Sequence, residues 1–153
     1  MNVLTISKIK DGTVIDHIPS GKALEVLRIL GIRRGSRERV SMAMNVESKK
    51  MKRKDIVKVE GKFISEEELN RISLIAPDAT INIIENFEIR RKFRVRIPER
   101  VEGLLRCPNG NCISNDGKEP VTSAFRIEKS ENLVFAVCMY CGKKIYEIEE
   151  YLV

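Results

Sequence analysis

The sequence lacks the residues and motifs on which most common enzyme chemistries depend. It contains no tryptophan, a single histidine (His17) and only 5% aromatic residues. It has no G-x-S-x-G nucleophile elbow, no G-x4-G-K-[ST] phosphate loop and no G-x-G-x-x-G dinucleotide motif. We therefore expect no catalytic activity from this chain alone, because the main hydrolase, kinase and dehydrogenase classes would lack their essential parts.

Long apolar segments are also absent. No run of about 18 apolar residues occurs, and the N-terminus lacks the basic and apolar regions of a signal peptide. The sequence therefore predicts a cytoplasmic protein that does not associate with membranes, in a compartment that keeps thiols reduced.

Cysteine is scarce, but its placement is informative. The chain has four cysteines, in a C-x4-C pair and a C-x2-C pair separated by 25 residues: Cys107, Cys112, Cys138 and Cys141. Two tight turns with this spacing can present four thiolates to one tetrahedral Zn²⁺ about 2.3 Å from each sulfur. We expect one structural zinc ion per chain, without His17 as a ligand. Two disulfides are the alternative, and they would need an oxidising compartment.

Charge divides the chain into two parts. Residues 1–98 carry 21 Lys and Arg against 13 Asp and Glu, whereas residues 99–153 carry 7 against 9. The second part holds all four cysteines, and a segment of this size buries too little surface to fold securely without a metal or a partner. We predict two domains, 1–98 and 99–153, with an anionic partner for the basic first domain.

The first domain shows the pattern of an α+β fold. Strands are predicted at Val3–Ile9 and Thr13–Ile15, and a helix follows with Ser20 as its N-cap and Gly31 at its end. Val40, Met42, Met44 and Val46 alternate along a half-buried strand.

A second predicted helix begins at the capping box of Ser65 and Glu68 and stops before Pro77. Strands at Lys54–Val59, Thr80–Ile84 and Phe87–Val95 complete the domain. The order strand, helix, strand, strand, helix, strand predicts a ferredoxin-like antiparallel sheet with two helices on one face and the other face open. For residues 99–153 we expect a small all-β zinc-binding domain.

Several segments together resemble the regulatory chain of aspartate carbamoyltransferase over nearly the whole sequence. They are Gly12–Pro19, Arg53-Lys54-Asp55 with Lys58, Ala76–Asn82, Pro98-Glu99-Arg100 and Cys107–Ser114. The resemblance implies a non-catalytic allosteric subunit of pyrimidine biosynthesis whose first domain binds the nucleotide effectors CTP, ATP and UTP. It further implies a zinc domain that docks onto the catalytic chain, and regulatory chains that pair as homodimers through their first domains, with the apolar positions of the strand at Val40–Val46 as candidate contacts.

The resemblance also implies an effector site. Carried over position by position, its residues are Ile9, Asp16, His17, Lys54, Lys58, Asn82, Ile84, Phe87, Ile89 and Lys92. Lys92, Lys54 and His17 would neutralise triphosphate oxygens, while Asp16 would accept hydrogen bonds from ribose hydroxyls. Many members of the family have an acidic residue in place of Ser7 and a tyrosine in place of Phe87, which bears on discrimination between bases.

Two other functions fit parts of the pattern. A zinc-ribbon nucleic-acid-binding protein would use the basic first domain, with Phe93 among Arg91, Lys92, Arg94 and Arg96. In such a protein the zinc segment would be expected to contact the nucleic acid, but this segment is acidic. We therefore expect no nucleic-acid partner. A structural adaptor without effector binding would keep the zinc and the interface, and would leave Asp16, His17, Lys58 and Lys92 as ordinary surface residues.

Overall fold

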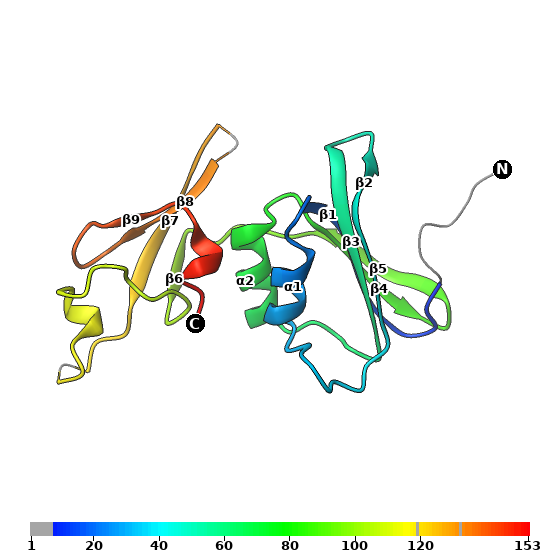
Figure 1. The fold of residues 1–153 in the computed structure, drawn as a ribbon, viewed down its shortest axis with the longest axis horizontal. Helices are drawn as coiled ribbons and strands as arrows, with labels where there is room; N and C mark the ends of the chain where they lie inside the picture. The colour runs from blue at the N-terminus through cyan, green and yellow to red at the C-terminus, as the bar shows by residue number, and fades with distance from the viewer. Residues whose placement is uncertain (1–7, 119, 132) are drawn as a thin grey trace. The chain divides into compact units, whose positions relative to one another are not determined.

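The computed structural model describes residues 8–153 with the exception of residues 119 and 132. The chain forms two compact units, Met1–Arg96 and Ile97–Val153 (Figure 1). Within the described residues, no helix is both long and apolar enough to cross a membrane. The predicted strand at Val3–Ile9 lies outside the described residues except for Lys8 and Ile9, which are not in a strand.

The first unit has the predicted ferredoxin-like architecture. Its elements are β1 (Gly12–Pro19), α1 (Ala23–Ile29), β2 (Val40–Ser48), β3 (Lys52–Glu60), α2 (Glu66–Ile75), β4 (Thr80–Glu85) and β5 (Glu88–Arg94). The sheet order is β2-β3-β1-β4-β5, and all neighbouring strands are antiparallel. Figure 1 shows α1 and α2 side by side on the same face of this sheet. The α+β prediction is confirmed, and β5 extends the sheet as a hairpin partner of β4.

The two faces of the sheet differ because side chains alternate along each strand. Ile15, Val57 and Ile81 face one another across β1, β3 and β4, and all three are fully buried. Their neighbour Val14 pairs with Lys58 on one side and with Asn82 on the other. This second row belongs to the face opposite the buried row, and we call it the open face.

Helix α1 is capped by a residue distant in sequence rather than by Ser20 as predicted. The carboxylate of Asp55 in β3 is fully buried, and its Oδ2 accepts hydrogen bonds from the backbone N–H groups of Gly21 at 2.8 Å and Ala23 at 3.0 Å. Its Oδ1 accepts from Asn45 N at 2.8 Å. The Ser20 hydroxyl instead donates to the side-chain oxygen of Asn45. A long-range contact therefore replaces the local cap.

Helix α2 begins as the sequence predicts. Ser65 Oγ accepts from Glu68 N at 3.1 Å, and Glu68 Oε1 accepts from Ser65 N at 3.0 Å. Lys62 pairs with Glu68 at 3.0 Å, and the helix ends at Ile75, two residues before Pro77. The capping box satisfies two N–H groups that the first helical turn leaves without a partner.

Strand β2 lies at one edge of the sheet and is more exposed than its alternating pattern predicts. Met42 and Met44 are 40% and 39% exposed, and Val40 and Val46 are only partly buried. The register with β3 shifts between Ala43 and Val46, which indicates a bulge. The apolar side chains of this strand are therefore only partly covered within the described part of the chain.

The second unit is a small antiparallel sheet, as predicted for the all-β zinc domain. Its elements are β6 (Arg100–Glu102), β7 (Ala124–Ser130), β8 (Leu133–Cys138) and β9 (Lys144–Ile145), in the order β6-β7-β8-β9. Of two short 3-10 helices, η1 (Ile113–Asn115) lies between β6 and β7 in sequence, and η2 (Ile148–Glu150) follows β9. The largest fully buried side chains of this unit are those of Leu105, Phe125, Ile145 and Ile148.

Candidate functional site

The four cysteines converge in the second unit. Cys107 and Cys112 bracket a loop between β6 and η1, Cys138 ends β8, and Cys141 follows in the turn before β9. All four Sγ atoms lie within 4.8 Å of one another, with 3.5 Å between Cys107 and Cys141 and 3.7 Å between Cys112 and Cys138. We call residues 107–112 the first knuckle and residues 138–141 the second knuckle.

These separations fit a tetrahedral metal ion. Sulfurs placed about 2.3 Å from a central Zn²⁺ would lie about 3.8 Å apart, whereas a disulfide needs about 2.05 Å. The four cysteines are therefore free thiols rather than the two disulfides of the alternative interpretation. Burial raises the pKa of Cys107 to about 12. A buried thiol of this kind becomes a thiolate when a metal cation supplies the compensating charge.

Hydrogen bonds hold the first knuckle in shape. The carbonyl oxygen of Asn109 accepts from Cys112 N at 3.0 Å and from Asn115 Nδ2 at 2.8 Å, and its side-chain Oδ1 accepts from Asn111 N at 3.0 Å. Asn115 Nδ2 also donates to the carbonyl oxygen of Cys107 at 2.9 Å. Asn115 is a positioning residue that the sequence analysis missed. Its position three residues after Cys112 does not predict this role, because only the folded backbone brings its side-chain amide back to the turn.

A pocket of about 440 Å³ lies on the open face of the first unit. Its lining residues come from the segment before β1, from β1, β3, β4 and β5, and from the β4–β5 turn: Lys8, Ile9, Val14, Asp16, Lys58, Asn82, Ile84, Phe87, Ile89 and Lys92. A single cross-strand row forms its floor, because Lys58 pairs with Val14, Val14 with Asn82, and Asn82 with Lys92.

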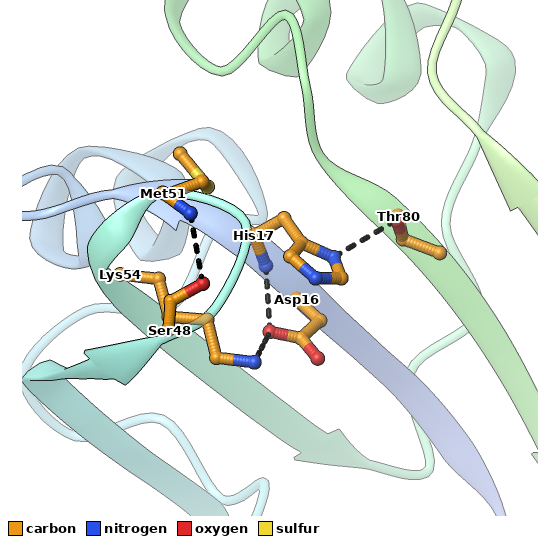
Figure 2. A network of polar contacts seen from close by, with 6 residues as sticks. All are labelled: Asp16, His17, Ser48, Met51, Lys54 and Thr80. Atoms are coloured by element: carbon orange, nitrogen blue, oxygen red, sulfur yellow. Dashed lines mark hydrogen bonds and ion pairs between the residues drawn. The ribbon is translucent and has the colours of Figure 1, made fainter.

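Eight of the ten residues expected for an effector site line this pocket. The other two, His17 and Lys54, contact Asp16 beside it. Lys54 Nζ lies 2.9 Å from Asp16 Oδ1, and the same oxygen accepts a hydrogen bond from His17 N at 2.6 Å (Figure 2). These two residues therefore do not line the pocket themselves, but both bind Asp16, which does.

Lys8 and Val14 also line the pocket, and neither was predicted as a site residue. Val14 could have been found, because it alternates with Asp16 along β1 and must share its face. Lys8 belongs to the predicted strand at Val3–Ile9, but it precedes the first described strand, and nothing in that prediction placed it at a ligand site. Ser7, whose identity bears on base discrimination, lies outside the described residues.

His17 has an unusual backbone conformation. Its φ is 58°, and it lies at the register shift between Ile15 and Ile18. The ring Nδ1 is 3.1 Å from Thr80 Oγ1 in β4, as Figure 2 shows. Burial lowers the pKa of His17; the positive charge of Lys54 adds to this shift and Asp16 opposes it. The imidazole is therefore neutral near pH 7.

The β2–β3 turn approaches this network. In Figure 2, Ser48 and Met51 lie near the Lys54–Asp16 pair, and Ser48 Oγ accepts a hydrogen bond from Met51 N at 3.2 Å. This bond fixes the turn from which Lys54 extends along β3.

The pocket combines positive charge, apolar surface and a buried acceptor to which no described residue donates. Burial lowers the pKa of Lys58, and the charge of Lys8 adds to the shift. Asn82 is 8% exposed, and within the described part of the chain its Oδ1 has no hydrogen-bond partner. A buried acceptor is costly when it lacks a donor, so this atom is suited to a hydroxyl, amine or water brought by a ligand.

One side of the pocket is apolar. Ile84 is buried, whereas Phe87 and Ile89 are 62% and 58% exposed on the β4–β5 hairpin. Phe87 has a φ of 64°, and its N–H donates to the carbonyl oxygen of Lys10 at 2.9 Å, which ties the hairpin turn to the bend before β1. Apolar walls beside a few converging charges are typical of small-molecule sites.

Comparisons with known proteins agree with this division. The family model described as "Aspartate carbamoyltransferase regulatory chain, allosteric domain" matches residues 4–96, and the one described as "Aspartate carbamoyltransferase regulatory chain, metal binding domain" matches residues 99–150. A protein of Archaeoglobus fulgidus named "Aspartate carbamoyltransferase regulatory chain" is 59% identical over 152 residues, which are 99% of each chain. Proteins of the same name from Staphylothermus marinus and Pyrococcus horikoshii are 52% and 53% identical; the first match covers 99% of this chain and 93% of the relative, and the second 97% of each.

Proposed function

This chain belongs to the family of aspartate carbamoyltransferase regulatory chains, and we propose that the pocket on the open face of its first unit binds nucleoside triphosphate effectors. As a regulatory chain it is the non-catalytic subunit of that transferase. CTP, ATP and UTP are the proposed effectors, and they would compete for the one pocket while favouring different states of the assembly.

The observation that carries the proposal is the row Lys58, Val14, Asn82 and Lys92 across the pocket floor. It combines two lysines with a buried acceptor that no described residue donates to, and this set is complementary to a ligand that has both anionic groups and hydroxyl or amine donors. Nucleotides have these groups on one molecule. Charge-assisted hydrogen bonds from lysine to phosphate supply the affinity.

We assign the ends of the pocket as follows. Lys92 neutralises triphosphate oxygens, and Lys58 donates to ribose or base oxygens. The base lies against Ile84, Ile89 and Phe87, whose apolar side chains suit its flat faces. The base edge meets main-chain groups of Ile9 and Ile89.

Asp16 has two roles in this assignment. It accepts hydrogen bonds from ribose hydroxyls, and it orients Lys54 and the His17 backbone at 2.9 Å and 2.6 Å. Lys54 then adds its positive charge beside the phosphates without being a lining residue. His17 contributes in the same indirect way, and its neutral ring becomes a better phosphate partner when it takes up a proton.

The second unit holds Zn²⁺ through the four cysteines and docks onto the catalytic chain. In support of this surface, Ile113, Met139 and Tyr140 are 45%, 45% and 47% exposed, and each lies next to or within two residues of a metal ligand. Exposed apolar side chains on a small rigid domain are suited to a partner interface. The metal fixes both knuckles, so it also fixes this surface.

Two regulatory chains pair through the edge strand β2. This part of the proposal rests on the exposure of Met42 and Met44 and on the open hydrogen-bonding edge that β2 presents. Effectors would act at a distance by binding one quaternary state better than the other, and such coupling is typically about 1 to 3 kcal/mol.

Calorimetric titration of CTP, ATP and UTP into the purified zinc-loaded chain tests the effector site. Lys92→Ala should weaken nucleotide binding, whereas Arg91→Ala should not, because Arg91 pairs with Ile83 and belongs to the other face of the same strand. This control removes one positive charge from β5 while leaving the pocket intact.

Single-stranded DNA titrated at the same moderate salt separates the other functions. Salt-sensitive DNA binding without a nucleotide preference would replace the effector proposal with a nucleic-acid-binding function. Binding of neither ligand would leave a structural adaptor that joins subunits without sensing nucleotides.

A further inference from the structure

The first knuckle contains an Asn-Gly peptide that its geometry does not require. Gly110 is exposed, its φ lies outside the left-handed region, and a Cβ added to it would meet no heavy atom within 4 Å. Alanine would therefore fit at this position without strain. By contrast, Gly142 after the second knuckle has a φ of 80° and serves a backbone need.

The missing Cβ matters for the chemistry of the preceding asparagine. In an Asn-Gly peptide the backbone nitrogen of Gly110 can attack the side-chain carbonyl carbon of Asn109, since no Cβ hinders its approach. The new N–C bond closes a succinimide, the bond from that carbon to Nδ2 breaks, and ammonia leaves with the proton from the glycine nitrogen. Water then opens the ring at either carbonyl and gives aspartate or isoaspartate.

Contacts in the folded knuckle oppose this reaction. The Asn109 carbonyl oxygen accepts from Cys112 N and Asn115 Nδ2, and its side-chain oxygen accepts from Asn111 N. Cyclisation requires the Asn109 side chain and the Gly110 nitrogen to rotate toward each other, which would break the hydrogen bond from Asn111. Cys107 and Cys112 hold the two ends of the same turn when both bind the metal.

We propose that the Asn109–Gly110 peptide is a site of spontaneous deamidation that metal binding protects and metal loss exposes. The proposal rests on a metal ion in the cysteine cluster. Loss of the ion releases both ends of the turn, and local opening then gives the glycine nitrogen access to the asparagine side chain. The modification converts a reversible loss of metal into a permanent one.

The products explain why rebinding would fail. Isoaspartate inserts a methylene into the main chain between two ligands and turns the Asn109 carbonyl, which accepts two hydrogen bonds here, into a side-chain carboxylate. Either product adds a negative charge beside four thiolates, and like charges oppose their joint ionisation. The first knuckle would no longer present Cys107 and Cys112 with the original spacing.

The test follows the full-length chain in zinc-loaded and chelator-treated forms at mildly alkaline pH and raised temperature. Peptide mapping by mass spectrometry measures amide-to-acid conversion at Asn109 and separates the aspartate and isoaspartate products. Zinc uptake is measured on the same samples. Asn86, which lies before Phe87 in the first unit, is the internal reference, since its conversion should not depend on zinc.

We expect Asn109 to convert at least about tenfold faster in the chelated chain, because the hydrogen bonds that hold it are lost when the turn opens. Gly110→Ala in the chelated form should convert several-fold more slowly and should keep its capacity for zinc. Asn115→Ala in the zinc-loaded form should convert faster than the loaded parent chain, which tests the hydrogen bonds without removing the metal.

Equal conversion rates with and without zinc would overturn the proposal, as would equal rates for the chelated parent chain and Gly110→Ala. A chain that takes up no zinc at any stage would overturn both this inference and the proposed metal site. A chain that binds zinc but shows no zinc-dependent conversion would overturn only the inference.

Discussion

Lys58 in β3 and Lys92 in β5 stand at the two ends of one cross-strand row on the open face, with Val14 and Asn82 between them. Neighbouring strands lie about 4.8 Å apart, so three intervals separate the two backbones by about 14 Å. Both side chains line the pocket, one from each end of the row. The two lysines are therefore placed to contact different parts of an extended ligand.

This separation gives a prediction about phosphate number. Lys92→Ala should remove most of the affinity advantage of CTP over CMP, because Lys92 is assigned to the triphosphate. Lys58→Ala should weaken CTP and CMP by similar factors, about tenfold if one charged hydrogen bond is lost. Calorimetry with CTP and CMP on both variants gives the four affinities, each to be compared with that of the parent chain. Reversed behaviour of the two variants would show that the ligand lies in the opposite direction.

Asn82→Leu should have opposite effects on stability and binding. The substitution keeps the branched shape of the side chain and removes a buried acceptor that has no donor among the described residues, so the ligand-free chain should gain about 1 kcal/mol in free energy of unfolding. Nucleotide affinity should fall about tenfold, since the ligand loses the acceptor for one of its donors. Urea unfolding and calorimetry test the two parts separately. A loss of stability with unchanged affinity would mean that the acceptor serves the fold rather than a ligand.

Local sequence signals predicted much of the fold and site. The capping box of Ser65 and Glu68 and the close spacing within each cysteine pair depend on residues near in sequence. The structure confirms the capping box and brings the four cysteines together. The cap of α1 depends on Asp55, more than thirty residues from Gly21. Ser20 matched the local rule for an N-cap, but the buried carboxylate of Asp55 accepts the hydrogen bonds at the start of α1 instead.

The pocket residues divide in a similar way. Asp16 and Lys58 could be placed on one face by strand periodicity once the family resemblance had drawn attention to them. Lys8 lies before β1 and lines the pocket through contacts that the sequence did not predict, and Asn115 reaches the first knuckle only through the path of the chain. Sequence periodicity assigns a residue to a face, but contacts between distant segments depend on the folded backbone.

Asp55→Ala should strongly destabilise the first unit. Three backbone N–H groups at Gly21, Ala23 and Asn45 would lose their acceptor, and a buried cavity would replace the carboxylate. We expect a loss of about 3 kcal/mol or more in free energy of unfolding. Asp78→Ala is the control, since Asp78 is an exposed partner of Arg94 and exposed ion pairs contribute little. Chemical denaturation followed by circular dichroism compares the two; equal losses would contradict the tertiary cap.

His17 predicts a pH dependence of stability. Its pKa in the folded chain is lowered mainly by burial, so the unfolded chain binds a proton more readily. The stability that depends on a neutral His17 is fully present above the unfolded pKa of about 6.5, and it is lost as the pH falls below that value. His17→Asn keeps a residue that tolerates the positive φ, and its stability should decline less than that of the parent chain between about pH 7 and pH 5. Parallel declines in the two proteins would assign the acid sensitivity to other groups.

Metal removal should act on one unit only. The second unit has a small core, and the free energy of zinc binding contributes directly to its folding, by about 10 kcal/mol or more in small zinc domains. A strong chelator should therefore abolish the folded signal of Ile97–Val153 while the first unit keeps its nucleotide affinity. Cys138→Ser should have the same effect without chelator, because Cys138 is a buried ligand that also ends β8. NMR amide spectra recorded during a chelator titration with CTP present follow both the unfolding of the second unit and the binding of CTP to the first unit. Loss of CTP binding in step with zinc release would show that the units are energetically coupled, whereas retained binding assigns the metal to the second unit's own fold and to the docking surface proposed for it.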